Sequence, residues 1–455
     1  MTTSDSGGPR PWRRALLWLV FLGPFFFLTY GLANWSAAQR ADVPSVVFAW
    51  EAGIPFWPWT IFPYWTIDLL YGLSLLVCTT RRELDTHVRR LLTAQVIAIA
   101  CFVVAPLRFS LEHPVADGLS GDMFALLAGF DRPFNQLPSL HIALAVILWA
   151  IYARKLSGAA RLAMEAWFAL ICVSVLTTYQ HHFIDIPTGL LLGAVCLWAW
   201  PFADEGNGRA IVEQWHWARD PQRRRLAGAY AAGAALLGAG ALQAGGWALW
   251  LLWGGVSCLL VALAYAAIGA GAFQKGADGH LSVAARWLFA PYLAAAWLNS
   301  RAWTWRDKRH VGVADGVFLG RVPTERELAA SPFAGVVDLT AEIDVCAGAS
   351  ALAVVPMLDL VRPDADALAQ AAQSIERLRA NGPVLVCCAL GYSRSACAVA
   401  AWLLASGRAC DVETAIAAVR AARAVVLDAG HAAALGGIAA ADVRGRAAAC
   451  LRSAD

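Results

Sequence analysis

Charged side chains are scarce in this chain: Asp, Glu, Lys and Arg make up only 15% of its 455 residues, and the formal net charge is +3. No stretch interleaves basic and aromatic residues as nucleic-acid-binding segments do, so nucleic acid is not an expected partner. A glycine-rich nucleotide-binding loop, a group of residues with metal-ligand spacing and an internal repeat are also missing. The sequence therefore predicts no nucleotide site, no metal site and no repeat architecture.

A disulfide framework is not indicated either. The eleven cysteines are an odd number, and five of them lie in apolar segments, where cysteine behaves as a small hydrophobic residue. Those five are Cys78, Cys101, Cys172, Cys196 and Cys258.

Hydrophobic residues, in contrast, are abundant: they make up 59% of the chain, which includes 21 tryptophans. This content exceeds what a soluble domain needs, and the length exceeds one ordinary domain. Arg10, Arg13 and Arg14 precede an apolar run from Ala15 to about Ala33. The run is longer than the core of a signal peptide and long enough to span a bilayer, so it predicts a retained first membrane helix.

Eight apolar runs are long enough to cross a bilayer. They lie at about 15–35, 58–79, 91–108, 139–153, 162–180, 185–202, 226–243 and 246–272. The N-terminus and every second connection carry fifteen Lys and Arg residues, whereas the alternate connections carry only Arg40, Arg108 and Arg132. Basic loops stay on the cytoplasmic side. The pattern therefore predicts a multi-pass protein of the inner (cytoplasmic) membrane whose C-terminal domain is cytoplasmic.

The stretch Leu281–Trp303 is apolar but contains Arg286 and Pro291, and basic residues follow it. We expect it to lie in the membrane interface as an amphipathic segment rather than to cross the bilayer. From about Val311 onward the polarity is ordinary, and strand-like and helical stretches alternate, which is typical of an α/β domain. Strands are expected at 336–340, 353–356 and 384–388, and helices at 365–380, 395–406 and from 412 onward.

The expected fold is thus a polytopic α-helical membrane domain of about eight spans followed by a C-terminal α/β domain. Residues 1–225 would hold six spans. Residues 226–308 would add two spans and the interfacial linker, and residues 309–455 would form the α/β domain.

The strongest chemical pattern is Cys388, five residues, then Arg394 and Ser395, placed between a predicted strand and a predicted helix, with Gly391 in the connecting loop. Backbone N–H groups at such a loop and helix N-terminus bind phosphate oxygens, and a guanidinium binds two more. The same positive field stabilises a thiolate on Cys388. A thiolate beside a bound phosphate is a nucleophile.

This pattern resembles the cysteine-dependent dual-specificity and tyrosine phosphatases over roughly the last third of the chain. The resemblance implies that Cys388 forms a phosphocysteine, that Arg394 binds the phosphoryl group and that the Ser395 hydroxyl helps the thiolate to leave. An upstream aspartate protonates the leaving oxygen; Asp359 matches it by position, with Asp364 and Asp366 as rivals.

One position departs from this family. Histidine commonly precedes the nucleophile there, whereas this chain has Cys387. Without this histidine, the way in which the Cys388 thiol is activated stays open, and Cys387 is a candidate disulfide partner that protects Cys388.

A second set of reactive residues lies in the membrane half. Pro138-Ser139-Leu140-His141 begins the fourth predicted span, and His181 precedes the sixth. Both histidines reach the same outer interface, because one span leads inward from His141 and the next leads back to His181. On a helix, His181 and Asp185 share a face, so the carboxylate can orient the imidazole.

Pro-Ser-Leu-His followed by His-x3-Asp resembles the PAP2 lipid phosphatase superfamily, in particular the branch with inositol-phosphorylceramide synthases, over about residues 15–202. The resemblance implies that His181 attacks phosphorus, Asp185 orients it, His141 protonates the leaving alkoxide and Ser139 contacts the phosphoryl oxygens.

Two cationic elements of the PAP2 superfamily are missing from this chain. Arg108 and Arg132 either supply these cations to the substrate or are interfacial anchors. His182 is expected to pack beside the site, and Asp68, a carboxylate within a span, is a functional candidate without a named partner.

The two resemblances together predict a phosphatase with two sites, a PAP2-type lipid-phosphate site outside and a cysteine phosphatase inside. Phosphorylated lipids are the expected substrates, membrane lipids the expected surroundings, and neither scheme needs a cofactor or metal. Three alternatives stay open. The outer site transfers a phospho-head-group, the cysteine domain acts on phosphoproteins, or the protein is a scaffold that binds phosphorylated partners.

Overall fold

The computed structural model describes residues 9–129 and 131–437. These residues form two compact units, which divide after Phe202. This division differs from the three parts expected from the sequence, and the three-part division stays a prediction.

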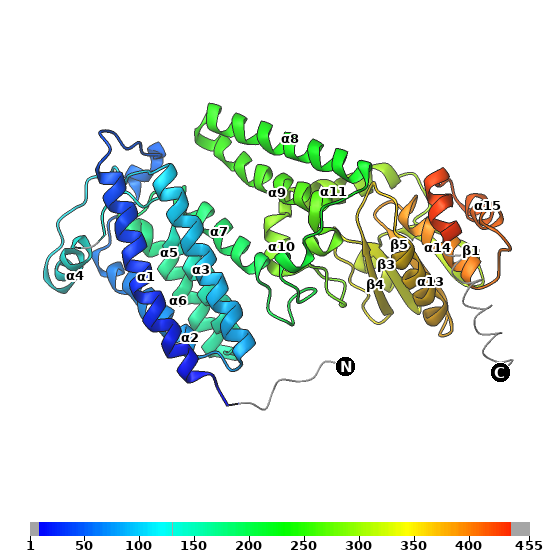
Figure 1. Cartoon of the computed structure of the whole chain (residues 1–455), viewed down its shortest axis with the longest axis horizontal. Coiled ribbons are helices and arrows are strands. Elements are labelled where there is room, and N and C mark those ends of the chain that lie inside the picture. Colours follow the sequence, from blue (N-terminus) through cyan, green and yellow to red (C-terminus); the bar gives the residue numbers. More distant parts are fainter. Residues whose placement is uncertain (1–8, 130, 438–455) are drawn as a thin grey trace. The chain divides into compact units, whose positions relative to one another are not determined.

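The first unit is a group of helices that lie side by side (Figure 1). Its helices are α1 (Trp12–Ala38), α2 (Ile61–Leu76), α3 (Arg81–Val104), α4 (Gly118–Ala128), α5 (Leu140–Ala153), α6 (Gly158–Thr177) and α7 (Asp185–Ala199). Six of them correspond to the first six predicted spans, and α4 was not predicted. Two short 3-10 turns, η1 (Ala49–Gly53) and η2 (Pro58–Thr60), lie between α1 and α2.

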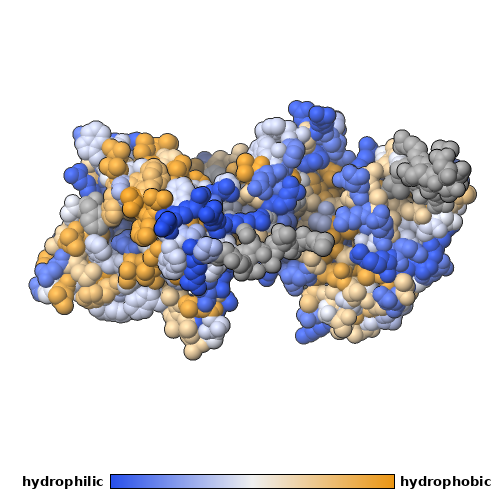
Figure 2. All heavy atoms as spheres, turned by 60° about the horizontal axis from the view of Figure 1, so that its bottom comes forward, coloured by the Kyte–Doolittle hydropathy of each residue, from blue (hydrophilic) through white to orange (hydrophobic). Residues whose placement is uncertain are grey.

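Apolar side chains cover much of the outside of the first unit (Figure 2). On α1, for example, Leu17, Val20, Leu28 and Leu32 are all exposed. In water this surface would be costly, whereas in a bilayer it needs no partner. Among the described residues, five helices are long and apolar enough to cross a membrane: α1, α3, α6, α8 (Pro221–Ala244) and the helical stretch Gly246–Ile268.

Small residues bring α5 and α7 close together. A Cβ atom on Gly189 would lie 2.6 Å from the Ser139 carbonyl oxygen, and one on Gly193 would lie 2.6 Å from the Val146 Cβ. Any larger residue would push the helices apart. This close approach places the start of α7 next to the start of α5, where the expected histidines lie.

The second unit begins with helices that lead to an α/β domain. α8 packs against α9 (Leu251–Leu263), which continues into a π-helical turn (Ala264–Ile268). The segment expected to be one interfacial stretch forms two helices, α10 (Val283–Leu288) and α11 (Ala290–Thr304). Pro291 lies in the first turn of α11, a position where proline is tolerated because it needs no backbone N–H donor. Trp297, Leu298 and Trp303 are exposed on α11, so its contact with a membrane interface stays a prediction.

A five-stranded sheet forms the centre of the α/β domain. Its strands are β1 (His310–Ala314), β2 (Val317–Arg321), β3 (Gly335–Thr340), β4 (Ala351–Met357) and β5 (Val384–Cys388). The spatial order is β1-β2-β5-β3-β4; β1 is antiparallel to β2, and all other neighbours are parallel. The expected strands are β3, β4 and β5, whereas β1 and β2 were missed.

Helices cover the sheet and complete two cores. α13 (Ala365–Arg379), α14 (Arg394–Ala405) and α15 (Val412–Ala422) contribute Leu368, Trp402 and Val419 to the larger core. The short α12 (Glu325–Ala329) lies beside the smaller core on the other face. The expected α/β domain is therefore confirmed. The carboxyl ends of β3, β4 and β5 meet at one edge, where ligands bind in open parallel sheets.

Candidate functional sites

The phosphate-binding loop connects the central strand β5, which ends at Cys388, to α14, which begins at Arg394. Gly391 has φ 78°, and a Cβ atom there would lie 2.6 Å from the Gly320 carbonyl carbon. Only glycine fits this position, because it allows both the left-handed backbone and the close contact. The first N–H groups of α14 lack intrahelical partners and face the loop, as at every helix N-terminus.

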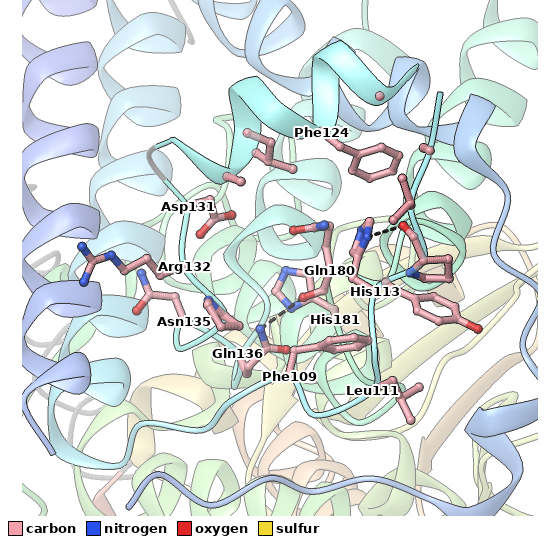
Figure 3. A pocket seen from close by; sticks show the side chains of 18 of the residues that line it. Phe109, Leu111, His113, Phe124, Asp131, Arg132, Asn135, Gln136, Gln180 and His181 are labelled. Carbon is pink, nitrogen blue, oxygen red and sulfur yellow. Dashed lines mark hydrogen bonds between the residues drawn. The ribbon is translucent and has the colours of Figure 1, made fainter. Parts of the chain in front are cut away.

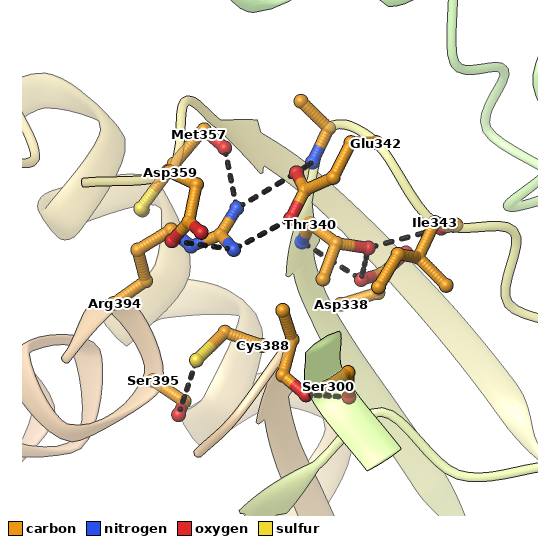
Figure 4. A network of polar contacts seen from close by, with 12 residues as sticks. Ser300, Asp338, Thr340, Glu342, Ile343, Met357, Asp359, Cys388, Arg394 and Ser395 are labelled. Atoms are coloured by element: carbon orange, nitrogen blue, oxygen red, sulfur yellow. Dashed lines mark hydrogen bonds and ion pairs between the residues drawn. The ribbon is translucent and has the colours of Figure 1, made fainter. Parts of the chain in front are cut away.

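The Cys388 thiol is the centre of this loop. It is only 3% exposed. Its Sγ accepts a hydrogen bond from the Gly391 N–H at 3.3 Å. It also accepts one from the Ser395 hydroxyl at 3.2 Å (Figure 4). The Ser395 hydroxyl, which was expected to help the thiolate to leave, is thus in contact with the sulfur.

Arg394 is almost fully buried and binds a carboxylate that the sequence did not predict. Its Nη1 and Nη2 donate to the two Glu342 oxygens at 2.9 and 2.7 Å, and Nη1 also donates to the Met357 carbonyl at 2.8 Å (Figure 4). Burial would raise the pKa of Glu342, but the Arg394 charge and its hydrogen bonds hold that pKa below its usual value. Among the described residues, Arg394 Nε is buried without a partner.

Of the three candidate acids, only Asp359 reaches the loop. Its Oδ1 lies 3.0 Å from Arg394 Nη2. A cavity of about 260 Å³ is lined by Asp359, Cys388 and Arg394 together. Asp364 instead caps α13 through the Ala367 N–H at 2.7 Å, and Asp366 lies in the first turn of that helix.

Cys387 does not pair with Cys388. Neighbouring residues of a strand point to opposite faces, and the two cysteines belong to different cores. Both are free thiols. Cys387 is therefore a packing residue, and the disulfide alternative is wrong.

Residues from the preceding helices also reach this site, which sequence patterns did not indicate. Gln222 of α8 lines the cavity, and the Tyr265 hydroxyl donates to the Asp359 carbonyl at 2.9 Å. The fully buried Lys275 forms an ion pair with Asp338 of β3 and donates to the Thr340 hydroxyl at 2.8 Å. These contacts join segments far apart in sequence, so no local motif could reveal them.

A histidine beside the loop was also missed. His431 Nε2 lies 3.0 Å from the Ser393 hydroxyl, and its Nδ1 lies 2.8 Å from Asp428 Oδ1. Asp428 and His431 both line the cavity that contains Cys388. The pair fixes the orientation of Ser393, which immediately precedes Arg394.

In the first unit, the structure brings Ser139, His181 and Asp185 together. His181 Nδ1 lies 3.0 Å from Asp185 Oδ2, and its Nε2 lies 3.2 Å from the Ser139 hydroxyl. Ser139 caps α5 by accepting from the Ile142 N–H. With Nδ1–H donated to the carboxylate, Nε2 carries the lone pair of the ring and accepts a hydrogen bond from the Ser139 hydroxyl.

His141 lies near the same place without a direct hydrogen bond to the group. Its ring stacks on Tyr64 at a centroid distance of 4.2 Å, and its Nε2 is buried without a partner among the described residues. His141 and His181 line one small cavity together with Asp68 and Asp131. Asp68, which lacked a partner in the sequence, therefore belongs to this group, and Asp131 was missed.

A larger cavity of about 550 Å³ is also lined by His181 (Figure 3). Arg132 lines it, but its guanidinium is exposed and points away from His181. Arg108 is exposed and does not line this cavity. Asp131 lines the cavity as well, and burial raises the pKa of its carboxyl. The structure thus brings a carboxylate, rather than the expected cations, close to His181.

His182 is a packing residue, as expected. Its Nδ1 lies 2.9 Å from Glu51 Oε2, its Nε2 accepts from the Ser110 N–H at 3.1 Å, and its ring stacks on Phe109. Both ring nitrogens are therefore engaged. Glu51, which the sequence did not single out, also accepts from the Phe183 N–H and fixes this turn.

Comparison with known proteins identifies the α/β domain. The family model described as the dual specificity phosphatase catalytic domain matches residues 317–436. No curated protein matches the chain.

Three solved structures are similar to about 30% of the chain. Human DUSP28 is 26% identical and covers 30% of this chain and 99% of its own, with a TM-score of 0.27. Tk-PTP in the active form is 24% identical and covers 29% and 97%, with a TM-score of 0.24. PTPMT1 in complex with PI(5)P is 18% identical and covers 30% and 99%, with a TM-score of 0.27. The C-terminal part of the chain is a dual specificity phosphatase catalytic domain, and the protein is a phosphatase that hydrolyses phosphate monoesters.

Proposed function

We propose that Cys388 is the nucleophile of this phosphatase. Its thiolate attacks phosphorus, the bond to the leaving oxygen breaks, and Asp359 gives that oxygen its proton. Water then cleaves the phosphocysteine, with Asp359 taking a proton from the water and the Ser395 hydroxyl donating to the departing sulfur. The observation that carries this proposal is the shared cavity of Cys388, Arg394 and Asp359. The unpartnered Arg394 Nε is a donor available to a phosphoryl oxygen.

The experiment is to trap the phosphocysteine by acid quench after mixing with labelled aryl phosphate in the absence of metal. Label should appear on the wild-type protein and accumulate in Asp359→Asn, whereas Cys388→Ser should carry none. Cys387→Ser is the matched control, because that thiol lies in the opposite core and should leave labelling intact. Labelling of Cys388→Ser at the wild-type level would refute the assignment.

The substrate of this site is proposed to be a phosphate on a lipid. Gln222, the second residue of α8, lines the catalytic cavity, and α8 is long and apolar enough to cross a membrane. A catalytic cavity at the end of such a helix is within reach of lipid head groups, and tethering raises their effective concentration. Phosphoproteins are the alternative substrate class.

A second, PAP2-type site is proposed at the outer face, with His181 as nucleophile, Asp185 as its orienting carboxylate and His141 as acid. The contacts of Ser139, His181 and Asp185 support this proposal. The carboxyl group of Asp131 lies near His181, whereas the Arg132 guanidinium points away, and the lack of a cation beside His181 in the described part of the chain favours a substrate with little negative charge. A phosphodiester carries less charge than a monoester, so head-group transfer is the second candidate function at this site.

Lipid phosphate release and head-group exchange should be measured side by side with purified Cys388→Ser protein in vesicles, in which the cysteine site is inactive. Adding His181→Gln to this background should abolish whichever reaction occurs, whereas His181→Gln alone should leave aryl phosphate hydrolysis at Cys388 intact, which also shows that the protein is folded. Persistence of the lipid reaction in the Cys388→Ser/His181→Gln double variant would contradict a site at His181. We further propose an inner-membrane location with the phosphatase domain in the cytoplasm, based on the basic loops.

A further inference from the structure

The loop that carries Asp359 is fixed by residues that lie outside the dual specificity phosphatase domain. We propose that the end of the α8–α9 pair positions the general acid, with Tyr265 and Gln222 as positioning residues; this inference rests on the proposed role of Asp359. The catalytic site would then be complete only when these helices are in place.

Two hydrogen bonds from the helices end on consecutive carbonyl groups of the acid loop. The Tyr265 hydroxyl donates to the Asp359 carbonyl at 2.9 Å, and the Gln222 amide donates to the Leu360 carbonyl. Leu360 has φ 56°, a backbone conformation that costs free energy for a residue with a Cβ. Donors on both carbonyls stabilise this conformation, so they determine where the Asp359 side chain points.

Tyr265 reaches the acid loop because α9 changes from α-helical to π-helical geometry just before this residue. α9 ends at Leu263, and Tyr265 is the second residue of the π-helical turn. π-helical turns are rare and are frequent at functional sites. The ring of Tyr265 stacks on Tyr230 of α8 at 5.7 Å and 8° between ring planes, which fixes the phenol.

The nucleophile does not depend on these two contacts. Cys388 accepts its hydrogen bonds from Gly391 and Ser395, and Arg394 is held by Glu342 and Met357, all within the phosphatase domain. Loss of Tyr265 or Gln222 contacts should therefore impair proton donation and leave nucleophilic attack unchanged. These two steps can be separated by the basicity of the leaving group.

The test compares kcat for an aryl phosphate and an alkyl phosphate with full-length protein in detergent. An aryl oxygen leaves without much help, whereas an alkoxide needs its proton, so acid catalysis shows as a selective effect on the alkyl substrate. Tyr265→Phe should lower kcat about five- to tenfold for the alkyl phosphate, the equivalent of one hydrogen bond, and should barely change it for the aryl phosphate. Gln222→Leu should show the same selectivity.

Tyr230→Phe is the matched control, since it keeps the stacked ring and removes a hydroxyl that does not bind the acid loop. It should behave as wild type with both substrates. Asp359→Asn is the reference for complete loss of the acid, and it should lower kcat for the alkyl phosphate selectively, by about a hundredfold or more. Suppose that Asp359→Asn lowers kcat selectively for the alkyl phosphate, but that Tyr265→Phe and Gln222→Leu lower kcat equally for both substrates or for neither. This inference is then wrong, and the proposed function stands. If Asp359→Asn itself is not selective, the acid assignment fails first.

Discussion

Arg394 shows how much a single buried side chain contributes to the site. Its planar guanidinium binds Glu342 on one side through two parallel hydrogen bonds and keeps Nε for another ligand. A lysine ammonium has no such geometry. We therefore expect Arg394→Lys to lower kcat/KM for aryl phosphates by about a hundredfold or more, because the Nε donor to the phosphoryl group and the paired contact with Glu342 are both lost. Steady-state kinetics checks this, and a loss below about threefold would contradict it.

Glu342 makes the site sensitive to acid. Its pKa is lowered in the folded protein by Arg394, so its contribution to stability is present above the unfolded value of about 4.3 and is lost as pH falls through the folded value. Glu342→Gln should destabilise the protein by about 3 kcal/mol at pH 7, since a buried charge loses its partner. Thermal unfolding of the wild type and of Glu342→Gln from pH 7 to pH 3 tests this expectation. The stability difference between the two proteins should become smaller as the pH falls. A stability difference that becomes larger at low pH would contradict the expectation.

Residue patterns singled out the candidate reacting groups but not the residues that contact and hold them. Cys388, Arg394 and Ser395 lie in one short motif, and His181 and Asp185 lie one helical turn apart, so local sequence is enough. Glu342 contacts Arg394 across 52 residues and Gln222 contacts Leu360 across 138. Such pairs depend on how the strands and helices pack. Residue spacing in the sequence does not predict this packing.

At the scale of elements, β3 is joined to the preceding helices by one buried ion pair. Lys275 inserts its ammonium beside Asp338, both side chains fully buried, and β3 leads directly to Glu342. Lys275→Met should destabilise the protein by about 3–5 kcal/mol, because Asp338 is then a buried charge without a partner. The double variant Lys275→Met/Asp338→Leu should recover most of the loss. Urea unfolding of the three proteins measures this coupling, and equal stability of single and double variants would contradict it.

The prediction of elements succeeded where apolar runs were continuous. β3 and β5 are buried at every position, and the residues 365–379 form the amphipathic α13, so their patterns were clear. β1 and β2 were missed because each is only five residues long and contains a glycine. The interfacial segment was predicted as one continuous stretch because it is apolar on both sides of Pro291. The structure instead has two helices there, α10 and α11.

At the scale of the whole molecule, the distribution of basic loops predicts which ends of the helices face the cytoplasm. A cysteine introduced at Asp117, at the start of α4, should react with a membrane-impermeant maleimide from outside. A cysteine introduced at Ser157, in the basic connection before α6, should be protected until the membrane is opened. The reverse pattern would overturn the arrangement.

The central claim is that the cysteine phosphatase acts on lipid phosphates at the membrane. The most direct measurement is kcat/KM of the full-length His181→Gln protein in vesicles, with phosphorylated glycerolipids, inositol lipids and phosphotyrosyl peptides offered in turn. Cys388→Ser in the same background gives the baseline. The account predicts that at least one phosphorylated lipid has a higher kcat/KM than every peptide and that Cys388→Ser abolishes its turnover. A kcat/KM for a phosphotyrosyl peptide at or above that of every lipid would contradict the claim.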